Sequence, residues 1–141
     1  MTDMTDMKND RTQPLFVYGT LLFDEIVRSL IGRTPAFRPA TALGYEARML
    51  RGVSYPGLVA VQGGRTEGLV FDDLSLTEWV ALDEYEDDFY TVTEIEVLME
   101  GGLSASALAY LVEGSMATPM IWTPAWFRSR HLSAFLGDLS R

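Results

Sequence analysis

The spacing of apolar residues along the chain changes from that of strands to that of helices and back. The first apolar run, Leu15–Tyr18, is short and rich in aromatic and β-branched side chains. It is bounded by Pro14 and Gly19, which predicts a buried first strand. Residues 22–31 instead place their apolar side chains on one broad helical face, and Gly32 follows as a C-terminal cap. The N-terminal part is therefore expected to run from a strand through a glycine turn into a helix.

The middle of the chain has the features of strands and hairpins. Residues 40–72 contain short β-rich pieces separated by glycine, proline and a Gly-Gly pair. Residues 90–112 alternate apolar and polar side chains on either side of Gly101–Gly102, which predicts a β-hairpin. Because consecutive hairpins pair antiparallel, the predicted fold class is α+β, with a curled, mostly antiparallel sheet or small barrel flanked by helices.

Two further helices are predicted from their capping residues. Ser75 and Glu78 have the S-x-x-E spacing of a capping box, which begins a helix in the middle of the chain. Near the C-terminus, Thr123 is a predicted N-cap and Pro124 occupies the first helical position. Gly137 is expected just past the end, so the pattern predicts a single closing helix.

Length and composition predict one domain with a substantial core. The chain has 141 residues, of which 48% are hydrophobic, and typical domains contain about 100–150 residues. Residues 1–13 are polar and lack the apolar segment of a signal peptide, so they are predicted to be a disordered tail before a domain at 14–141. No apolar run approaches the roughly 20 residues that cross a bilayer, so no membrane partner is expected.

The charge and the rare residue types exclude several classes of partner and site. The net charge of −9 and the absence of a basic run argue against a nucleic-acid partner. The chain has no cysteine, which excludes disulfides and thiolate metal sites and fits folding in the cytoplasm. His131 is the only histidine, so a histidine-rich metal site is excluded as well. A small-molecule partner is the remaining expectation.

One acidic residue stands out on the central predicted helix. Trp79, Leu82 and Glu86 lie on one face of that helix, and Asp83 borders the same face. Apolar surroundings and the nearby negative charge would raise the pKa of Glu86 toward the range of a general base. An ordinary surface glutamate at a fraying helix end is the alternative, and spacing alone favours it. The acidic run that continues to Asp88 lacks the order of a calcium-binding loop, so no metal is expected.

The turn after the first strand is the second candidate site. Tyr18, Gly19, Thr20 and Leu21 lead from a strand into a helix, which exposes consecutive backbone N–H groups to an anionic ligand. Gly19 would also allow a ligand to approach the backbone closely. The alternative is a plain strand-to-helix connection that needs glycine for its geometry, and spacing alone favours that reading. The chain has no G-x-G-x-x-G and no Walker sequence, so nucleotide sites are excluded.

Taken together, these segments resemble the gamma-glutamylcyclotransferase-like family, in particular its small single-domain members of the avirulence-induced-gene type. The resemblance extends from Leu15 to about Val112. It rests on the following segments in this order: FVYGTL at 16–21, GR at 32–33, ALGY at 42–45, YPGLV at 55–59, EGLVFDDL at 67–74, LDEYE at 82–86, Tyr90 and ALAYLV at 107–112.

The resemblance implies a small mixed barrel with helices at its edges and an enzyme that releases 5-oxoproline from a gamma-glutamyl amine or peptide. Glu86, which ends the L-D-x-x-E motif, would be the catalytic acid and base. The loop Tyr18–Leu21 would grip the glutamyl end of the substrate, and Tyr90 and Tyr110 would line the cavity. Neither a cofactor nor a metal is implied. The family often has glycine after the glutamate, whereas this chain has Asp87, whose charge would raise the pKa of Glu86 further.

Two other functions remain open on the same fold. One is a non-catalytic module that binds a small ligand, and the other is a related transfer of an acyl or amide group.

Overall fold

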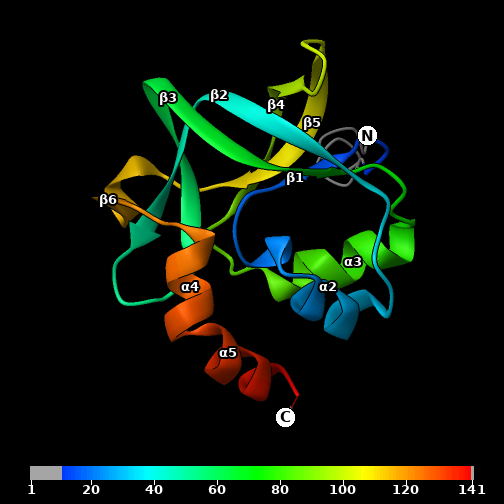
Figure 1. The fold of residues 1–141 in the computed structure, drawn as a ribbon, viewed down its shortest axis with the longest axis vertical. Coiled ribbons are helices and arrows are strands. Elements are labelled where there is room, and N and C mark those ends of the chain that lie inside the picture. The colour runs from blue at the N-terminus through cyan, green and yellow to red at the C-terminus, as the bar shows by residue number, and fades with distance from the viewer. Residues whose placement is uncertain (1–10, 141) are drawn as a thin grey trace, which may run out of the picture.

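Five strands close into a small barrel, and a sixth extends it at one edge (Figure 1). The computed structural model describes residues 11–140. The strands are β1 (Leu15–Val17), β2 (Phe37–Leu50), β3 (Pro56–Phe71), β4 (Thr91–Met99), β5 (Ser104–Leu111) and β6 (Ala117–Ile121). Around the barrel they follow the order β1-β3-β2-β4-β5, and β5 returns to β1 in parallel while the other neighbouring pairs are antiparallel. The predicted mixed, mostly antiparallel barrel is confirmed.

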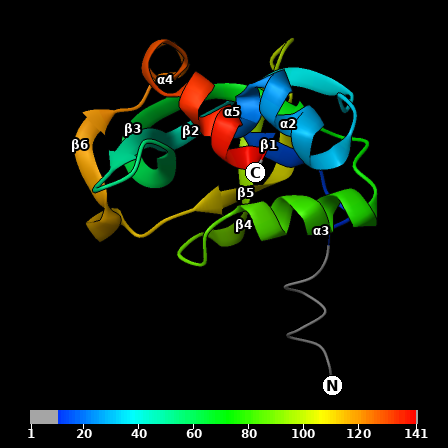
Figure 2. The same cartoon turned by 90° about the horizontal axis from the view of Figure 1, so that it is seen from below.

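The α-helices gather at one side of the barrel strands (Figure 1). They are α2 (Asp24–Ile31), α3 (Leu76–Tyr85), α4 (Pro124–Arg130) and α5 (Leu132–Leu139), and the 3₁₀ turns are η1 (Thr20–Leu22), just before α2, and η2 (Gly114–Met116), just before β6. Figure 2 shows this side face on, with α2, α3 and α5 in front of the strands. None of the helices within residues 11–140 has the length and apolar character needed to cross a membrane.

The caps predicted at Gly32, Ser75 and Thr123 are present. The Ser75 hydroxyl accepts from the Glu78 amide, and the Glu78 carboxylate accepts from the Ser75 amide, which completes the capping box of α3. Arg33, just after α2, donates to the same carboxylate and lowers the pKa of Glu78 to about 2. This ion pair connects the C-terminal end of α2 to the N-terminal end of α3. Gly32 closes α2 with a left-handed φ of 81°, and the Thr123 hydroxyl accepts from the backbone amide three residues on to cap α4.

Two details differ from the predictions. The pieces at 40–72 belong to two long strands that pair from Phe37↔Phe71 to Met49↔Pro56, with an irregularity at Gly44, whose φ is 88°. The prediction of a single closing helix is wrong, because the helix is interrupted at His131 and Gly137 lies inside the second helix, α5. Phe127 and Leu132 are both buried although five positions would separate them by about 140° on one continuous helix. The break lets both side chains reach the core.

The short strand β1 lies between two hydrophobic cores. Phe16 and Tyr18 point into the barrel, whereas Leu15 and Val17 pack against the helices. All four side chains are buried, as expected for the first strand. The chain therefore leaves the barrel at Tyr18, between the two cores.

The predicted disordered tail, residues 1–13, falls for the most part on residues 1–10, which lie outside the described residues. Its last residues are described. Arg11 pairs with Asp83 on α3, and the Gln13 side chain accepts a hydrogen bond from Ser106 on β5. The amide of Leu108 then donates to the carbonyl of Pro14, so this segment follows β5 into β1.

Candidate active site

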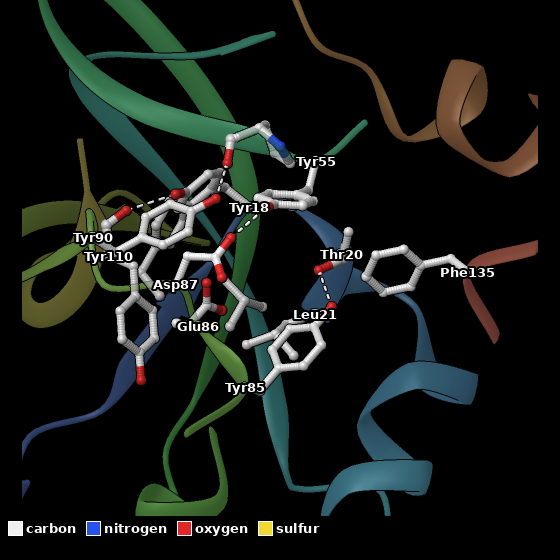
Figure 3. A pocket seen from close by; sticks show the side chains of 14 residues that line it. Tyr18, Thr20, Leu21, Tyr55, Tyr85, Glu86, Asp87, Tyr90, Tyr110 and Phe135 are labelled. Carbon is white, nitrogen blue, oxygen red and sulfur yellow. Dashed lines mark hydrogen bonds between the residues drawn. The ribbon is translucent and has the colours of Figure 1, made fainter. Parts of the chain in front are cut away.

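A cavity of about 130 Å³ lies where β1 leaves the barrel (Figure 3). It is smaller than the roughly 300–1,000 Å³ of pockets for drug-sized molecules, which suits a ligand of amino-acid size. All seven residues predicted for the site line it: Tyr18, Gly19, Thr20, Leu21, Glu86, Tyr90 and Tyr110. The structure thus brings together segments that are separated by as many as 92 positions in the sequence, as the Tyr18–Tyr110 hydrogen bond shows.

Glu86 extends into this cavity from the C-terminal end of α3. Its amide donates to the Leu82 carbonyl at 3.2 Å, so the last turn of the helix fixes its position. The side chain is partly buried, and within residues 11–140 no group donates a hydrogen bond to its carboxylate. Burial, followed by the negative charges of Asp87 and Asp83, raises the pKa of Glu86 from 4.5 to about 8. This is the direction that the sequence predicted.

The turn after β1 lines the same cavity through Gly19, Thr20 and Leu21. In η1 the Gly19 and Thr20 carbonyls accept from the amides of Leu22 and Phe23 at 2.9 and 3.1 Å. The amides of Gly19, Thr20 and Leu21 donate to no acceptor within residues 11–140, although these three residues are buried. Buried amides require a partner, so this turn is suited to an anionic group of a ligand.

The neighbouring strand gives a further reason for glycine at position 19. A Cβ atom there would lie 2.7 Å from Cγ of Pro56, at the start of β3, which is closer than carbon atoms can pack. The close neighbour is therefore the proline ring of the adjacent strand, and the absence of a side chain keeps the turn against β3.

Tyrosines form much of the cavity wall, and their hydroxyl groups are held by the protein. The Tyr18 hydroxyl donates to the Tyr110 carbonyl at 2.6 Å and accepts from the Leu58 amide at 3.2 Å, which joins β1, β3 and β5. The Tyr90 hydroxyl donates to the Pro56 carbonyl. Burial is the main cause that raises the pKa of all three tyrosines well above the ordinary value, so they remain protonated at neutral pH.

The more exposed rim of the cavity is formed by four residues that the sequence reasoning did not assign to the site: Tyr55, Tyr85, Asp87 and Phe135 (Figure 3). The Tyr55 hydroxyl donates to the Asp87 carboxylate. The Thr20 hydroxyl and the Tyr85 hydroxyl share a hydrogen bond of 2.7 Å. Phe135 of α5 meets the Tyr85 ring edge-on, with 6.3 Å between ring centroids. Tyr55 and Tyr85 lie within sequence segments that carry the family resemblance, whereas no such signal marks Phe135.

The acidic run of α3 does not converge on a common point. Asp83 pairs with Arg11, Asp87 accepts from Tyr55, and Glu84 and Asp88 are exposed. Within residues 11–140, no three histidine, aspartate or glutamate side chains are grouped so that they could hold a metal ion.

The fold and the cavity define a class of protein: a small mixed barrel in which a partly buried carboxylate shares a cavity with a turn of buried amides. Residues 15–127, about four fifths of the chain, match the family described as "Gamma-glutamyl cyclotransferase, AIG2-like". The chain belongs to this family.

Comparisons with individual proteins agree. AIG2-like protein D of Arabidopsis thaliana is 32% identical over 85 residues, which cover 60% of this chain and 56% of that protein. AIG2-like protein C of the same plant is 34% identical over 85 residues, covering 60% and 49%. The chain thus spans about half the length of the curated relatives it matches.

Solved structures show the same fold. A solution structure of an Arabidopsis thaliana protein has a TM-score of 0.68 at 24% identity, and the match covers 92% of this chain and 91% of that one. A structure titled "Gamma-glutamyl cyclotransferase" has a TM-score of 0.62 at 16% identity, covering 91% and 86%.

Proposed function

We propose that the protein releases 5-oxoproline from a gamma-glutamyl amine or peptide, with Glu86 as the acid and base. The observation that carries the proposal is the shared cavity: Glu86 and the turn Gly19–Leu21, whose amides have no acceptor within residues 11–140, line the same space. The carboxylate can handle protons there, while the amides can hold an anion. Family membership supports the reaction class.

In the proposed reaction, the α-amino nitrogen of the glutamyl group attacks the side-chain carbonyl carbon of the same residue. A C–N bond closes the five-membered lactam, and the C–N bond to the leaving amine breaks. The α-nitrogen loses two protons in total, one before the attack and one as the lactam forms. The leaving nitrogen gains two and departs as an ammonium ion. Glu86 accepts a proton from the first nitrogen and donates one to the second, and water carries the remaining proton.

The pKa of Glu86 suits this transfer. The raised value of about 8 is close to the value of roughly 8 for an α-ammonium group, so moving a proton between them costs little free energy. Positioned proton transfers of this kind contribute about 10²–10⁴-fold to a rate. An ordinary solvated glutamate would be a much weaker base toward an ammonium group. The partly buried, tyrosine-lined surroundings of Glu86 would therefore make it a stronger base for this reaction.

The amides of Gly19, Thr20 and Leu21 would bind the α-carboxylate of the substrate or the oxyanion that develops on the attacked carbonyl. Either contact would hold the glutamyl chain folded, and ideal intramolecular geometry can supply several kcal/mol of the roughly 7–11 kcal/mol available to such ring closures. The protonated tyrosines add no negative charge to the cavity, so they do not oppose an anionic substrate.

The test is to incubate the full chain with a panel of gamma-glutamyl amines and dipeptides and to measure 5-oxoproline by liquid chromatography. Glu86→Gln should reduce turnover at least about 100-fold while calorimetry still detects binding of 5-oxoproline. Glu84→Gln, an exposed change on the same helix, is the matched control and should leave turnover unchanged.

Two outcomes would contradict the proposal. Full activity of the Glu86→Gln variant would show that Glu86 is not the acid and base. Binding without turnover across the whole panel would instead favour the non-catalytic module or a related group transfer.

A further inference from the structure

Arg11 contacts the helix that carries Glu86, although it precedes the residues that match the family. Its Nε and Nη2 atoms lie 3.2 and 3.1 Å from Oδ2 of Asp83. The guanidinium carbon lies 5.3 Å from the centre of the Trp79 ring, which is a cation–π contact. Only 10% of the Arg11 side chain is exposed. Arg11 is therefore fixed on α3 at two points.

Asp83 connects this arginine to the cavity wall. Its second oxygen, Oδ1, accepts from the Tyr110 hydroxyl at 2.6 Å. The Tyr110 ring lines the cavity and meets the Tyr90 ring edge-on, with 6.2 Å between centroids. Arg11, Asp83 and Tyr110 thus form one continuous chain of contacts from the N-terminal segment to the wall beside Glu86.

The charges around Glu86 give this chain an electrostatic consequence. Among residues 11–140, the carboxylates of Asp83 and Asp87 interact with Glu86, together with five neutral tyrosines: Tyr18, Tyr55, Tyr85, Tyr90 and Tyr110. Asp87 has a tyrosine hydroxyl as its partner, which does not neutralise it. Within the described part of the chain, the only ion pair to either carboxylate is the one that Arg11 makes. Without Arg11, Glu86 would face two unpaired negative charges.

We propose that Arg11 is a positioning residue of this site, which pairs with Asp83 to limit the negative charge facing Glu86 and to hold Tyr110 against the cavity. The consequence for turnover rests on the proposed function, whereas the consequence for the protonation of Glu86 does not. The segment before β1 thereby belongs to the site.

The experiment follows the Glu86 carboxyl by ¹³C NMR during a pH titration of the full chain, with Glu86→Gln used to identify its signal. Four proteins are compared: the wild type, Arg11→Gln, Arg11→Lys and the double variant Arg11→Gln with Asp83→Asn. The double variant keeps an oxygen that can accept from Tyr110 while it removes the charge. Thermal unfolding of each variant shows whether it is folded under the titration conditions.

Arg11→Gln should raise the titration midpoint of Glu86 by about half to one pH unit, because the charge that compensates Asp83 is lost. Arg11→Lys keeps the charge and should shift the midpoint by less than half as much. The double variant should return the midpoint to the wild-type value or below it. If the protein releases 5-oxoproline, the pH at the midpoint of the acid limb of kcat/KM should rank the variants in the same order as the titration midpoints. The value of kcat/KM at high pH should change little.

An unchanged midpoint in folded Arg11→Gln would overturn the proposal, and so would a raised midpoint that persists in the double variant. If Arg11→Gln does not fold, Arg11→Lys and the double variant still decide, because the proposal predicts a midpoint near or below the wild-type value in both, and a rise of half a pH unit or more in either would overturn it. Failure of the wild type to release 5-oxoproline would count against the proposed reaction and leave these titrations interpretable.

Discussion

Replacing Glu86 by glutamine should make the folded protein more stable, and the gain should grow with pH. The substitution keeps the size of the side chain and removes a negative charge that the cavity disfavours. In the folded protein the pKa of Glu86 is about 8 instead of 4.5, mainly because of burial. A catalytic group held in an unfavourable charge state commonly costs stability, so loss of activity and gain of stability are expected together.

The magnitude follows from proton linkage. Between pH 4.5 and about 8, folded Glu86 keeps a proton that the unfolded chain has released. The free energy of unfolding of the wild type therefore falls as the pH rises through this range, and the full loss is reached above the folded-state pKa. One pKa unit corresponds to about 1.4 kcal/mol, so the loss between pH 5 and pH 8 is on the order of 2–3 kcal/mol after some screening by water at the cavity rim. Glutamine does not titrate and escapes this loss.

Thermal unfolding followed by circular dichroism at pH 5 and pH 8 measures the effect. The difference in Tm between Glu86→Gln and the wild type should be wider at pH 8 by roughly 6–12 °C. Glu84→Gln removes a charge from an exposed site on the same helix, and its difference from the wild type should be small at both pH values. A Glu86→Gln difference that is the same at pH 5 and pH 8 would refute the reasoning, because it would show that the carboxyl is as well solvated in the folded protein as in the unfolded chain.

Three further predictions concern the neighbours of the proposed base. Asp87→Asn removes a negative charge beside it, so the acid limb of the kcat/KM profile against pH should move down by about half a unit to one unit; a move to higher pH would contradict this. Gly19→Ala places a Cβ 2.7 Å from Pro56 and should cost about 1–3 kcal/mol in chemical denaturation, whereas Gly137→Ala, in a helix with no atom within 4 Å, should gain about 0.5–1 kcal/mol. Phe135→Ala opens the rim and should raise kcat/KM for bulky leaving amines relative to small ones, without changing the affinity for 5-oxoproline; equal changes for all amines would mean that Phe135 does not contact the leaving group.

Local signals in the sequence were sufficient for the elements whose ends are set by local contacts. The capping box of Ser75 and Glu78 involves residues three apart, so it could be recognised without the rest of the fold, and it is present at the start of α3. The break at His131 could not be recognised in this way. It depends on the burial of Phe127 and Leu132 against a core supplied by other segments, which no capping or propensity signal records.

The candidate site was predictable to the extent that its residues belong to short segments with a chemical signature. Glu86 follows the apolar stripe of α3, and the amides of the turn follow from a strand that meets a glycine, so both could be named as candidates. The family resemblance was needed to favour them over an ordinary surface glutamate and a plain connection. Phe135 contributes shape alone. A phenylalanine at the rim has no charge or motif that distinguishes it from an ordinary core residue, and only the packing of the C-terminal helices brings it to the cavity.

The position of the site follows from how the barrel closes. Strand β1 is only three residues long, and it fits between β3 and β5 because Gly68 has no Cβ where the Val17 carbonyl approaches, at 2.2 Å from the position that atom would take. After Val17 the chain leaves both neighbouring strands, so the next amides lose their strand partners while they are still buried between two cores. A buried amide without a partner is costly, and the protein supplies no acceptor for these amides within residues 11–140.

The same closure brings the end of α3 beside the turn, through the hydrogen bond between Thr20 and Tyr85, the residue before Glu86. Amides that need an acceptor and a carboxyl that favours its protonated form are therefore neighbours because of the topology, and a ligand with an anionic group and a proton to exchange satisfies both.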